Sequence, residues 1–297
     1  MVIPSTEITK EIEMIVVTGA SGQLGRLVME FLLQRVPAGQ LVAAVRSPHK
    51  VADLAARGVV VRHADYSDPA SLRRAFSGAS KVLLISGNEI GQRLPQHAAV
   101  IEAAKAVGVP WLFYTSLLRA DVSPLGLAEE HRQTERLIRD SGLNHVLLRN
   151  GWYTENYLAS VPAALTHLAF LGSAGEGLIA SAARADYAEA AAVALTREQA
   201  SGTIYELAGD EAYTLAQFSA AIAEAAGKPV VYQDLPQVEF AAVLEQAGLP
   251  PEFARLLADS DVGASRGGLF DDSHTLSQLI DHATTSWRTM VHAAAGS

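Results

Sequence analysis

The chain has 297 residues, of which 49% are hydrophobic, and its formal net charge is −9 at pH 7. This length suits one large α/β domain, or a domain with a smaller partner region. The negative charge, without a long basic run, argues against nucleic acid as the main partner. The absence of cysteine excludes disulfides, iron–sulfur ligation and thiol catalysis, and it fits the cytoplasm, where we expect the protein to reside.

The N-terminal segment, residues 1–13, has neither an apolar core nor a cleavage pattern. We therefore expect a flexible extension there rather than a signal peptide. No stretch of the chain approaches the roughly 18 uninterrupted apolar residues that a membrane helix needs, so we expect no membrane span.

The most informative segment of the sequence is the glycine-containing stretch after the N-terminal residues. An apolar run stops at three glycines spaced three apart (Gly19, Gly22 and Gly25), and a helix-like pattern begins at once. This order predicts a strand, a tight phosphate-binding turn and a helix N-terminus. Gly19 would allow the sharp turn, Gly22 would let the backbone approach a pyrophosphate, and Gly25 would let the helix pack close to the strand. The free N–H groups and the dipole of the helix would face the phosphates.

The second apolar run, Leu41–Val45, is followed by Arg46 and then by Lys50. In NAD-preferring folds this strand end usually carries an acid for the ribose 2′-hydroxyl, about 20 residues past the glycines. No acidic residue lies between Glu30 and Asp53. Arg46, as a bidentate fork, and Lys50, as a point charge, would instead meet a 2′-phosphate; the alternative is that both are solvated loop cations. The missing acid favours NADPH.

Strand and helix patterns alternate as far as residue 150. Short apolar strands separated by helices indicate a parallel sheet covered on both faces, so the sequence predicts an α/β, doubly wound Rossmann domain over residues 14–150. Asp68 and Pro69 predict a helix start, and Gly142 a helix end. The expected strands are Met14–Val17, Leu41–Val45, Val59–Arg62, Lys81–Ser86, Trp111–Thr115 and His145–Arg149, and the expected helices are Leu24–Gln34, Lys50–Arg57, Ala70–Phe76, Leu94–Val107 and Leu127–Asp140.

Residues 151–297 follow a different pattern, and we expect a smaller α/β cap there, packed on the substrate side of the sheet. Thr214 and Gln217 have the spacing of a capping box. The segment Pro250–Leu279 is expected to hold short helices broken by its glycines, Gly263, Gly267 and Gly268. The expected strands are Leu178–Ala180 and Thr203–Leu207, and the expected helices are Ala185–Leu195 and Leu215–Ala226.

Ligands of an open parallel sheet lie beyond the C-terminal strand ends, at the switch in strand order. Thr115 would lie near a nicotinamide ribose, and Asn150 and Tyr153 would line the nicotinamide and substrate pocket. Asp65 would either accept a hydrogen bond from the adenine amino group or cap a turn. The segments that this rule selects are Gly19–Gly25, Ser86–Asn88, Thr115–Ser116 and Asn150–Tyr153.

Short-chain dehydrogenases normally carry a Tyr-x-x-x-Lys pair, in which Tyr donates a proton and Lys lowers its pKa. None of the five lysines follows a tyrosine by four residues, so alcohol–ketone chemistry by that route is not expected. On the helix after the fifth strand, where such a pair would lie, His131 is the candidate proton donor, although a histidine there is more often structural. No helical histidine pair and no Gly-x-Ser-x-Gly elbow occurs, so we expect neither a metal site nor a hydrolase.

These motifs resemble a known family. Thr18–Gly25 is similar to the opening fingerprint of NmrA-like, atypical short-chain dehydrogenases. The similarity extends from about residue 14 to about residue 280, and related triphenylmethane dye reductases share the architecture. Four segments look more specifically like the bacterial NADPH:quinone oxidoreductases of that family, namely Tyr114–Ser116, Leu148–Tyr157, Ala258–Ala264 and Gly267–His274. Two features depart from the family pattern, the extra N-terminal residues 1–13 and Asp281–Ala283 in place of Gly-Arg-Pro.

The resemblance implies an NADPH-dependent reductase with a quinone or similar conjugated small molecule as acceptor. Asn150 and Tyr153 would orient the nicotinamide or the quinone oxygen, and Trp152 and Tyr157 would supply apolar walls, unless they form an ordinary aromatic cluster. With the residues selected above, the expected cofactor set is Gly19, Ala20, Ser21, Gly22, Gln23, Leu24, Gly25, Arg46, Ser86, Gly87, Asn88, Thr115, Asn150, Gly151, Trp152, Tyr153, Thr154 and Glu155.

Quinone reduction can proceed by direct hydride transfer from nicotinamide C4 when the ring and the acceptor are in contact. Because a quinol oxygen is a weaker base than an alkoxide, a Tyr/Lys acid pair is dispensable. Two alternatives stay open: a redox sensor that binds dinucleotides and acts through a protein partner, and a reductase of dyes, imines or enones. The sequence also leaves open the physiological acceptor and the oligomeric state, a homo-oligomer included.

Overall fold

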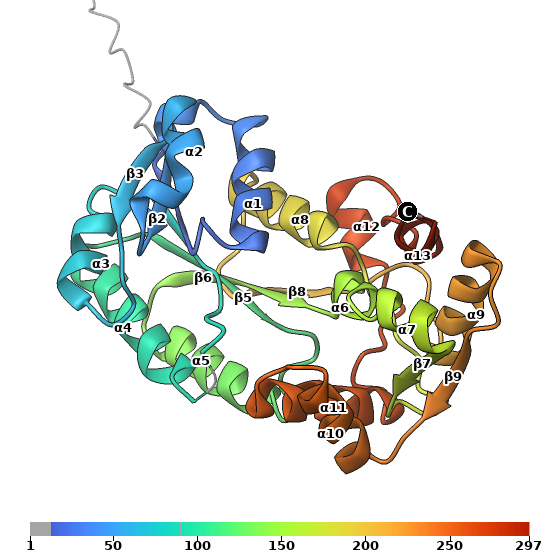
Figure 1. Cartoon of the computed structure of the whole chain (residues 1–297). Coiled ribbons are helices and arrows are strands. Elements are labelled where there is room, and N and C mark those ends of the chain that lie inside the picture. Colours follow the sequence, from blue (N-terminus) through green and yellow to red (C-terminus); the bar gives the residue numbers. More distant parts are fainter. Residues whose placement is uncertain (1–12, 90, 297) are drawn as a thin grey trace, which may run out of the picture.

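The computed structural model describes residues 13–89 and 91–296, so the extension expected over residues 1–13 lies outside the described part except for Glu13. Within these residues one parallel sheet has the strand order β3-β2-β1-β4-β5-β6-β8 (Figure 1). The order reverses beside β1, as in a doubly wound Rossmann sheet. The strands are β1 (Ile15–Thr18), β2 (Leu41–Val45), β3 (Val60–His63), β4 (Lys81–Leu84), β5 (Trp111–Leu117), β6 (Asn144–Asn150) and β8 (Thr203–Leu207).

Helices cover both faces of this sheet, as predicted. Because side chains alternate across a strand, Ile15 and Val17 of β1 join the core under α1 and α8. Val16, between them, joins the core under α3 and α4. The helices around the sheet are α1 (Gln23–Leu33), α2 (Ala52–Ala56), α3 (Pro69–Phe76), α4 (Arg93–Ala106), α5 (Ala128–Asp140), α8 (Arg184–Thr196) and α12 (Thr275–Ile280), with the 3₁₀ turns η1 (Ala38–Gln40) and η2 (Pro48–Val51).

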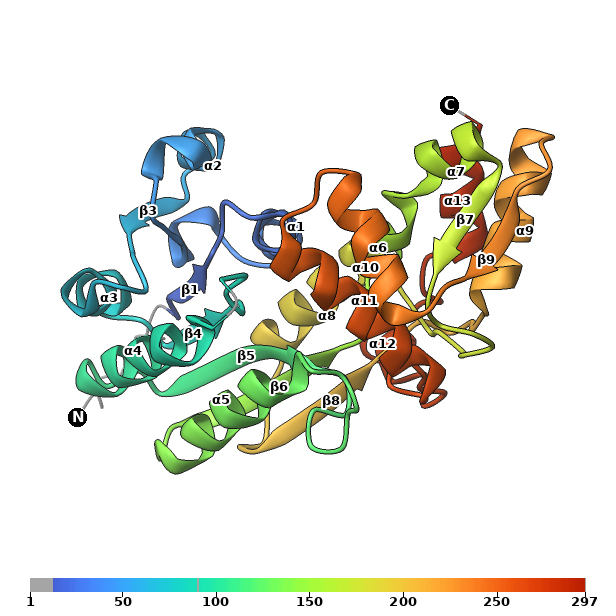
Figure 2. The ribbon, with the colours of Figure 1, turned by 60° about the horizontal axis from the view of Figure 1, so that its bottom comes forward.

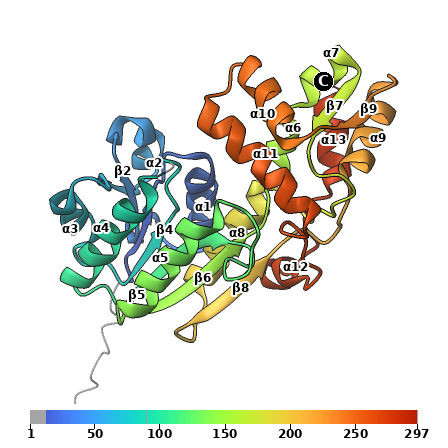
Figure 3. The same ribbon diagram turned by 90° about the horizontal axis from the view of Figure 1, so that it is seen from below.

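The cap lies to one side of the sheet (Figures 2 and 3). It contains a two-stranded parallel sheet, β7 (Ala169–Gly172) with β9 (Val231–Asp234). Its helices are α6 (Thr154–Leu158), α7 (Val161–His167), α9 (Leu215–Ala226), α10 (Gln237–Gln246), α11 (Pro251–Ser265) and α13 (Trp287–Ala295). Two elements that follow the expected boundary at residue 150 belong to the main domain. β8 completes the main sheet beside β6, and α8 packs under that sheet with α1.

Most expected elements agree with the structure to within two residues, and the local signals act as predicted. Asp68 accepts a hydrogen bond from the Ala70 N–H at the start of α3, and Gly142 has a φ of +78° after α5. The capping box at the start of α9 is formed by Thr214 and Gln217.

Two expectations in the cap are wrong. Leu178–Ala180 is not a strand, since Ile179 makes only an isolated bridge with Tyr213. Gly263 does not break a helix, because α11 runs through it and ends at Ser265. Its lack of a side chain serves packing instead: a Cβ atom there would lie 2.9 Å from the Leu125 side chain. The elements α6, α7, β7, β9, α10 and α13 had no counterpart among the expected ones.

The C-terminal segment that departs from the family pattern is held to the main body by two aspartates. Thr284 donates its N–H to Asp210 at 2.8 Å, and Thr285 donates its N–H to Asp186 at 2.8 Å. Asp281 adopts a left-handed conformation at the end of α12. The altered sequence therefore keeps a firmly anchored path into α13.

A buried ion-pair network joins α5 to the sheet. The side chains of Arg149 on β6 and Glu135 on α5 are only 4% and 2% exposed, and they pair at 2.7 Å. Ser116 on β5 donates to the same carboxylate at 2.6 Å. Burial raises the pKa of Glu135, but the hydrogen bonds from Arg149 and Ser116 outweigh this effect and lower the pKa below its usual value.

We expect Arg149→Met to lower the free energy of unfolding by about 3–5 kcal/mol, because it leaves a buried carboxylate without its main partner. Arg139→Met is the matched control: Arg139 pairs with the same Glu135 but is half exposed, so its loss should cost at most about 1 kcal/mol. Urea unfolding of both variants measures the difference. Equal decreases in the free energy of unfolding would show that the buried pair stabilises the protein no more than the half-exposed one.

Candidate functional site

The glycine loop between β1 and α1 has the predicted shape. Gly19 has a φ of +62°, which a residue with a side chain rarely adopts. Its carbonyl oxygen accepts a hydrogen bond from the Gly22 N–H at 2.9 Å, which closes the turn. A Cβ atom on Gly25 would lie only 2.3 Å from that same oxygen. Gly25 therefore lets α1 begin directly against the loop.

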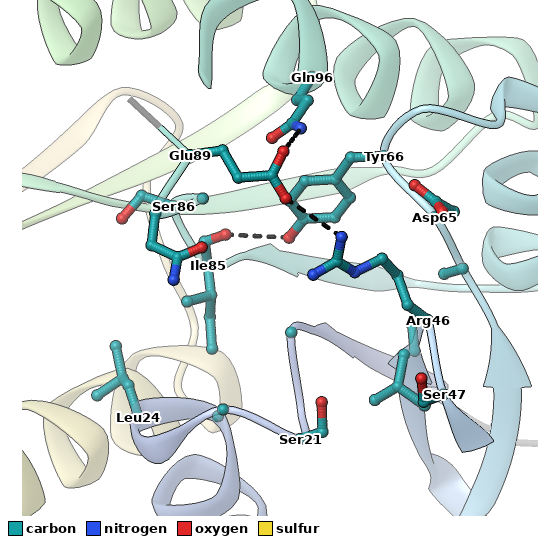
Figure 4. A pocket seen from close by; sticks show the side chains of 18 of the residues that line it. Ser21, Leu24, Arg46, Ser47, Asp65, Tyr66, Ile85, Ser86, Glu89 and Gln96 are labelled. Carbon is teal, nitrogen blue, oxygen red and sulfur yellow. Dashed lines mark hydrogen bonds and ion pairs between the residues drawn. The ribbon is translucent and has the colours of Figure 1, made fainter. Parts of the chain in front are cut away.

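A cavity of about 660 Å³ opens beyond this loop and the C-terminal ends of β2, β3 and β4. Figure 4 shows side chains from all four segments converging on it. Ten residues of the expected cofactor set line it: Gly19, Ser21, Gly22, Gln23, Leu24, Gly25, Arg46, Ser86, Gly87 and Asn88. Lys50 and Asp65 line it as well. Ala20, by contrast, is buried in the core under α1.

The basic side chains that line the cavity, Arg46 and Lys50, lie after the end of β2. Arg46 is exposed, and its guanidinium lies 3.2 Å from the carboxylate of Glu89 across the cavity. The first turn of α1 carries no acidic residue, so the helix N-terminus and Arg46 both favour an anion. Asp65 accepts a hydrogen bond from the Ser67 N–H at 2.9 Å, so it caps a turn while also facing the cavity.

Tyr66 lines the cavity and was missed by the sequence reasoning. Its hydroxyl donates to the Ile85 carbonyl at 3.0 Å and lies 2.5 Å from the hydroxyl of Thr18. Thr18 in turn donates to the Leu83 carbonyl. Burial raises the pKa of Tyr66, so the phenol stays neutral and ties the ends of β1, β3 and β4 together. An isolated tyrosine after a strand gives no signal of such a role.

Two further residues that sequence reasoning missed fix the loop after β4. His97 accepts the Gly87 N–H on Nε2 at 3.0 Å, and Arg93 donates to the Gly87 carbonyl at 2.8 Å. Burial lowers the pKa of His97 to about 3, so the ring stays neutral and Nε2 remains an acceptor. Its Nδ1 lies 3.0 Å from the Thr134 hydroxyl on α5. Both polar backbone groups of Gly87, its N–H and its carbonyl, are thus held in place.

The expected residues at the ends of β5 and β6 lie outside the lining of this cavity. Thr115 reaches it indirectly, because its hydroxyl accepts the Ser86 N–H at 2.9 Å. Asn150 is buried, and its Oδ1 has no hydrogen-bond partner among the described residues. Such an atom is costly to bury unless a ligand or water supplies a donor. Burial raises the pKa of the Tyr153 phenol, and a hydrogen bond with Asn150 opposes the rise.

The residues after Asn150 mostly tie the sheet to the cap. The Gly151 N–H donates to the Leu207 carbonyl at 2.7 Å, and the Thr154 hydroxyl lies 2.8 Å from that of Ser181. Glu155 accepts the Arg184 N–H. Trp152 packs in the cap core with Tyr157 at a ring distance of 6.3 Å, and this position favours the aromatic-cluster alternative over a role in a pocket wall.

The geometry around His131 gives no support for its expected role as a proton donor. Its Nδ1 lies 2.7 Å from the Tyr114 hydroxyl, and both side chains are buried. Burial lowers the pKa of His131 well below its usual value, so the ring is a neutral hydrogen-bond partner at ordinary pH. His131 is also absent from the cavity lining. This placement favours the structural alternative.

A doubly wound sheet with a glycine loop, a helix N-terminus and basic side chains around one cavity defines a dinucleotide-binding protein of the Rossmann class. The chain belongs to the NAD(P)H-binding family, whose sequence profile matches residues 19–198.

Similar proteins include several reductases. The chain is 59% identical to quinone oxidoreductase 2 of Escherichia coli over 273 residues, 92% of this chain and 96% of that protein. The crystal structure of the NADPH-dependent Escherichia coli quinone oxidoreductase complexed with NADPH matches with a TM-score of 0.92 and 58% identity, over 94% of this chain and 99% of that one. Triphenylmethane reductase from Citrobacter sp., complexed with NADP(H), matches with a TM-score of 0.90 and 37% identity, over 94% and 99%. The family resemblance expected from the motifs is thereby confirmed.

We expect His97→Leu to weaken the binding of a nicotinamide dinucleotide by about tenfold, because it leaves the Gly87 N–H unpaired and frees the loop that lines the cavity. His97→Gln should restore most of the affinity, since its amide can both accept from Gly87 and donate to Thr134. Titration of dinucleotide into each variant, with the melting temperature measured alongside, checks this. Equal affinity in His97→Leu and the unmodified protein would remove His97 from the site.

Proposed function

We propose that this protein is an NADPH-dependent reductase that passes hydride to a quinone. The observation that carries the proposal is 59% identity to a quinone oxidoreductase over 92% of the chain. The cavity supports it: Arg46 and Lys50 line the end at β2, where an NAD-preferring protein would usually present an acid. The comparisons support a small-molecule acceptor, and the quinone is its proposed class. The cytoplasm remains the proposed compartment.

The residues present fit NADPH. The glycine loop and the N-terminus of α1 would hold the pyrophosphate, and a Cβ atom on Gly22 would lie 3.3 Å from the Gly19 carbonyl oxygen, at the turn the phosphates must approach. Arg46 and Lys50 would hold the 2′-phosphate. The unpartnered Oδ1 of Asn150 would accept a hydrogen bond from the carboxamide of the nicotinamide.

When bound, NADPH supplies the hydride. The residues of the chain would then position the cofactor and the acceptor and exclude water. They need not provide a strong acid, because quinone oxygens need little help in taking up a proton. Asn150 and Tyr153 are the proposed orienting residues. Burial raises the pKa of Tyr153, so its phenol stays protonated and able to donate a hydrogen bond to an acceptor oxygen.

We expect the protein to consume NADPH in preference to NADH with a simple benzoquinone, followed as loss of absorbance at 340 nm. Arg46→Ala should lower kcat/KM for NADPH by about 10- to 100-fold and leave NADH much less affected, because only NADPH carries the 2′-phosphate. Arg74→Ala is the control: Arg74 on α3 has nearly the same side-chain exposure, 69% against 67% for Arg46, but pairs with Asp68, the N-cap residue of that helix. An unchanged cofactor preference in Arg46→Ala would contradict the assignment.

The same assay separates the alternatives. A redox sensor would bind NADP(H), distinguish its oxidised and reduced forms and fail to consume NADPH with any quinone. A reductase of dyes, imines or enones would consume NADPH, with higher kcat/KM for those acceptors than for benzoquinone.

We expect Asn150→Ala to lower kcat by about tenfold or more, because it removes the proposed partner of the nicotinamide carboxamide and of Tyr153. Asn144→Ala is the matched control, since Asn144 lies at the opposite end of β6, exposed, with its amide on the Pro110 carbonyl. Full turnover and unchanged affinities in a folded Asn150→Ala variant would show that Asn150 has no such role.

A further inference from the structure

An ion pair spans the cavity between two loops of the main sheet. Arg46 follows β2 and Glu89 follows β4, and these strands flank β1 on either side. The Arg46 guanidinium and the Glu89 carboxylate therefore meet, 3.2 Å apart, with the glycine loop between their strands (Figure 4). A ligand that lies on the glycine loop and reaches toward the end of β2 meets this pair.

The carboxylate of Glu89 is aimed by a neighbour. One of its oxygens, Oε2, accepts a hydrogen bond from the Gln96 amide at 2.7 Å, and the other, Oε1, accepts from Arg46. Gln96 belongs to α4, the helix whose His97 and Arg93 hold the backbone N–H and carbonyl of Gly87. The acid is thus presented toward Arg46 from a supported position.

The pair is nevertheless easily replaced. The side chain of Arg46 is 67% exposed and that of Glu89 is 43% exposed, and exposed ion pairs contribute little stability. A phosphate monoester carries nearly two charges and can bind a guanidinium through two parallel hydrogen bonds, which makes it a stronger partner for Arg46 than one carboxylate oxygen. The other charged groups that line the cavity are Lys50 and Asp65.

We propose that Glu89 is a specificity-determining residue that competes with the cofactor's 2′-phosphate for Arg46, a proposal that rests on the proposed NADPH site. NADPH binds only by exchanging the carboxylate for the phosphate. NADH has no phosphate to offer Arg46, so the ion pair persists in its complex. Glu89 thereby reduces the preference for NADPH that Arg46 alone would create, and it keeps the guanidinium oriented across the cavity while the phosphate is absent.

The test is the ratio of dissociation constants for NADH and NADPH, measured by calorimetric titration of the full chain. Glu89→Gln keeps the size of the side chain and its bond to Gln96 but removes the charge. We expect the ratio to rise about two- to fivefold in favour of NADPH, the weight of one exposed ion pair. Glu102→Gln is the control, because Glu102 is an exposed acid on α4 whose ion pair among the described residues is local, with Lys105. It should leave the ratio as it is.

A second pair of variants tests whether Glu89 acts through Arg46. In an Arg46→Ala background, Glu89→Gln should no longer raise the ratio, since the contested guanidinium is gone. An undiminished rise in that background would show direct repulsion of the phosphate and overturn the competition. An unchanged ratio in Glu89→Gln alone, or weaker binding of both cofactors, would also overturn it. Failure of the unmodified protein to bind NADPH would refute the proposed function itself, a result distinct from these.

Discussion

The close approach of Gly25 to the carbonyl oxygen of Gly19 is the constraint on which the nucleotide site depends. A Cβ atom at position 25 would lie 2.3 Å from that oxygen, so any larger residue would push α1 away from the loop. With glycine there, the first turn of α1 begins at the end of β1 and its free N–H groups face the cavity. The place of the helix N-terminus beside the cavity and the direction of the helix dipole both depend on this contact.

Helix α5 provides the second level of organisation. Its Glu135 holds Arg149 of β6 and Ser116 of β5, its Thr134 orients His97, and its Glu130 pairs with Arg93. Through Thr134 and Glu130, which hold His97 and Arg93, the same helix fixes the backbone N–H and carbonyl of Gly87 at the cavity. This helix is where a Tyr-x-x-x-Lys pair is missing, and its polar side chains serve to position neighbouring elements instead.

The local signals were readable because they depend on neighbouring residues in the chain. The glycine spacing, the proline after Asp68 and the capping box at Thr214 each describe one turn of backbone. Gly263 failed as a predictor for the opposite reason. Whether a glycine breaks a helix or admits a neighbour depends on what packs against it, here Leu125 from a distant loop. His131 is similar, since only its burial beside Tyr114 separates a structural histidine from a proton donor.

The sequence by itself determined the Rossmann class, the glycine loop, the missing acid after β2 and two of the segments that line the cavity, Gly19–Gly25 and Ser86–Asn88, because each of these is set by apolar periodicity and short-range backbone chemistry. Only the tertiary structure decided that β8 returns to the main sheet, that His97 and Arg93 hold Gly87, and that Glu89 faces Arg46. Those pairings join residues that are distant in sequence, or loops whose direction no local pattern specifies, so they arise only when the sheet assembles.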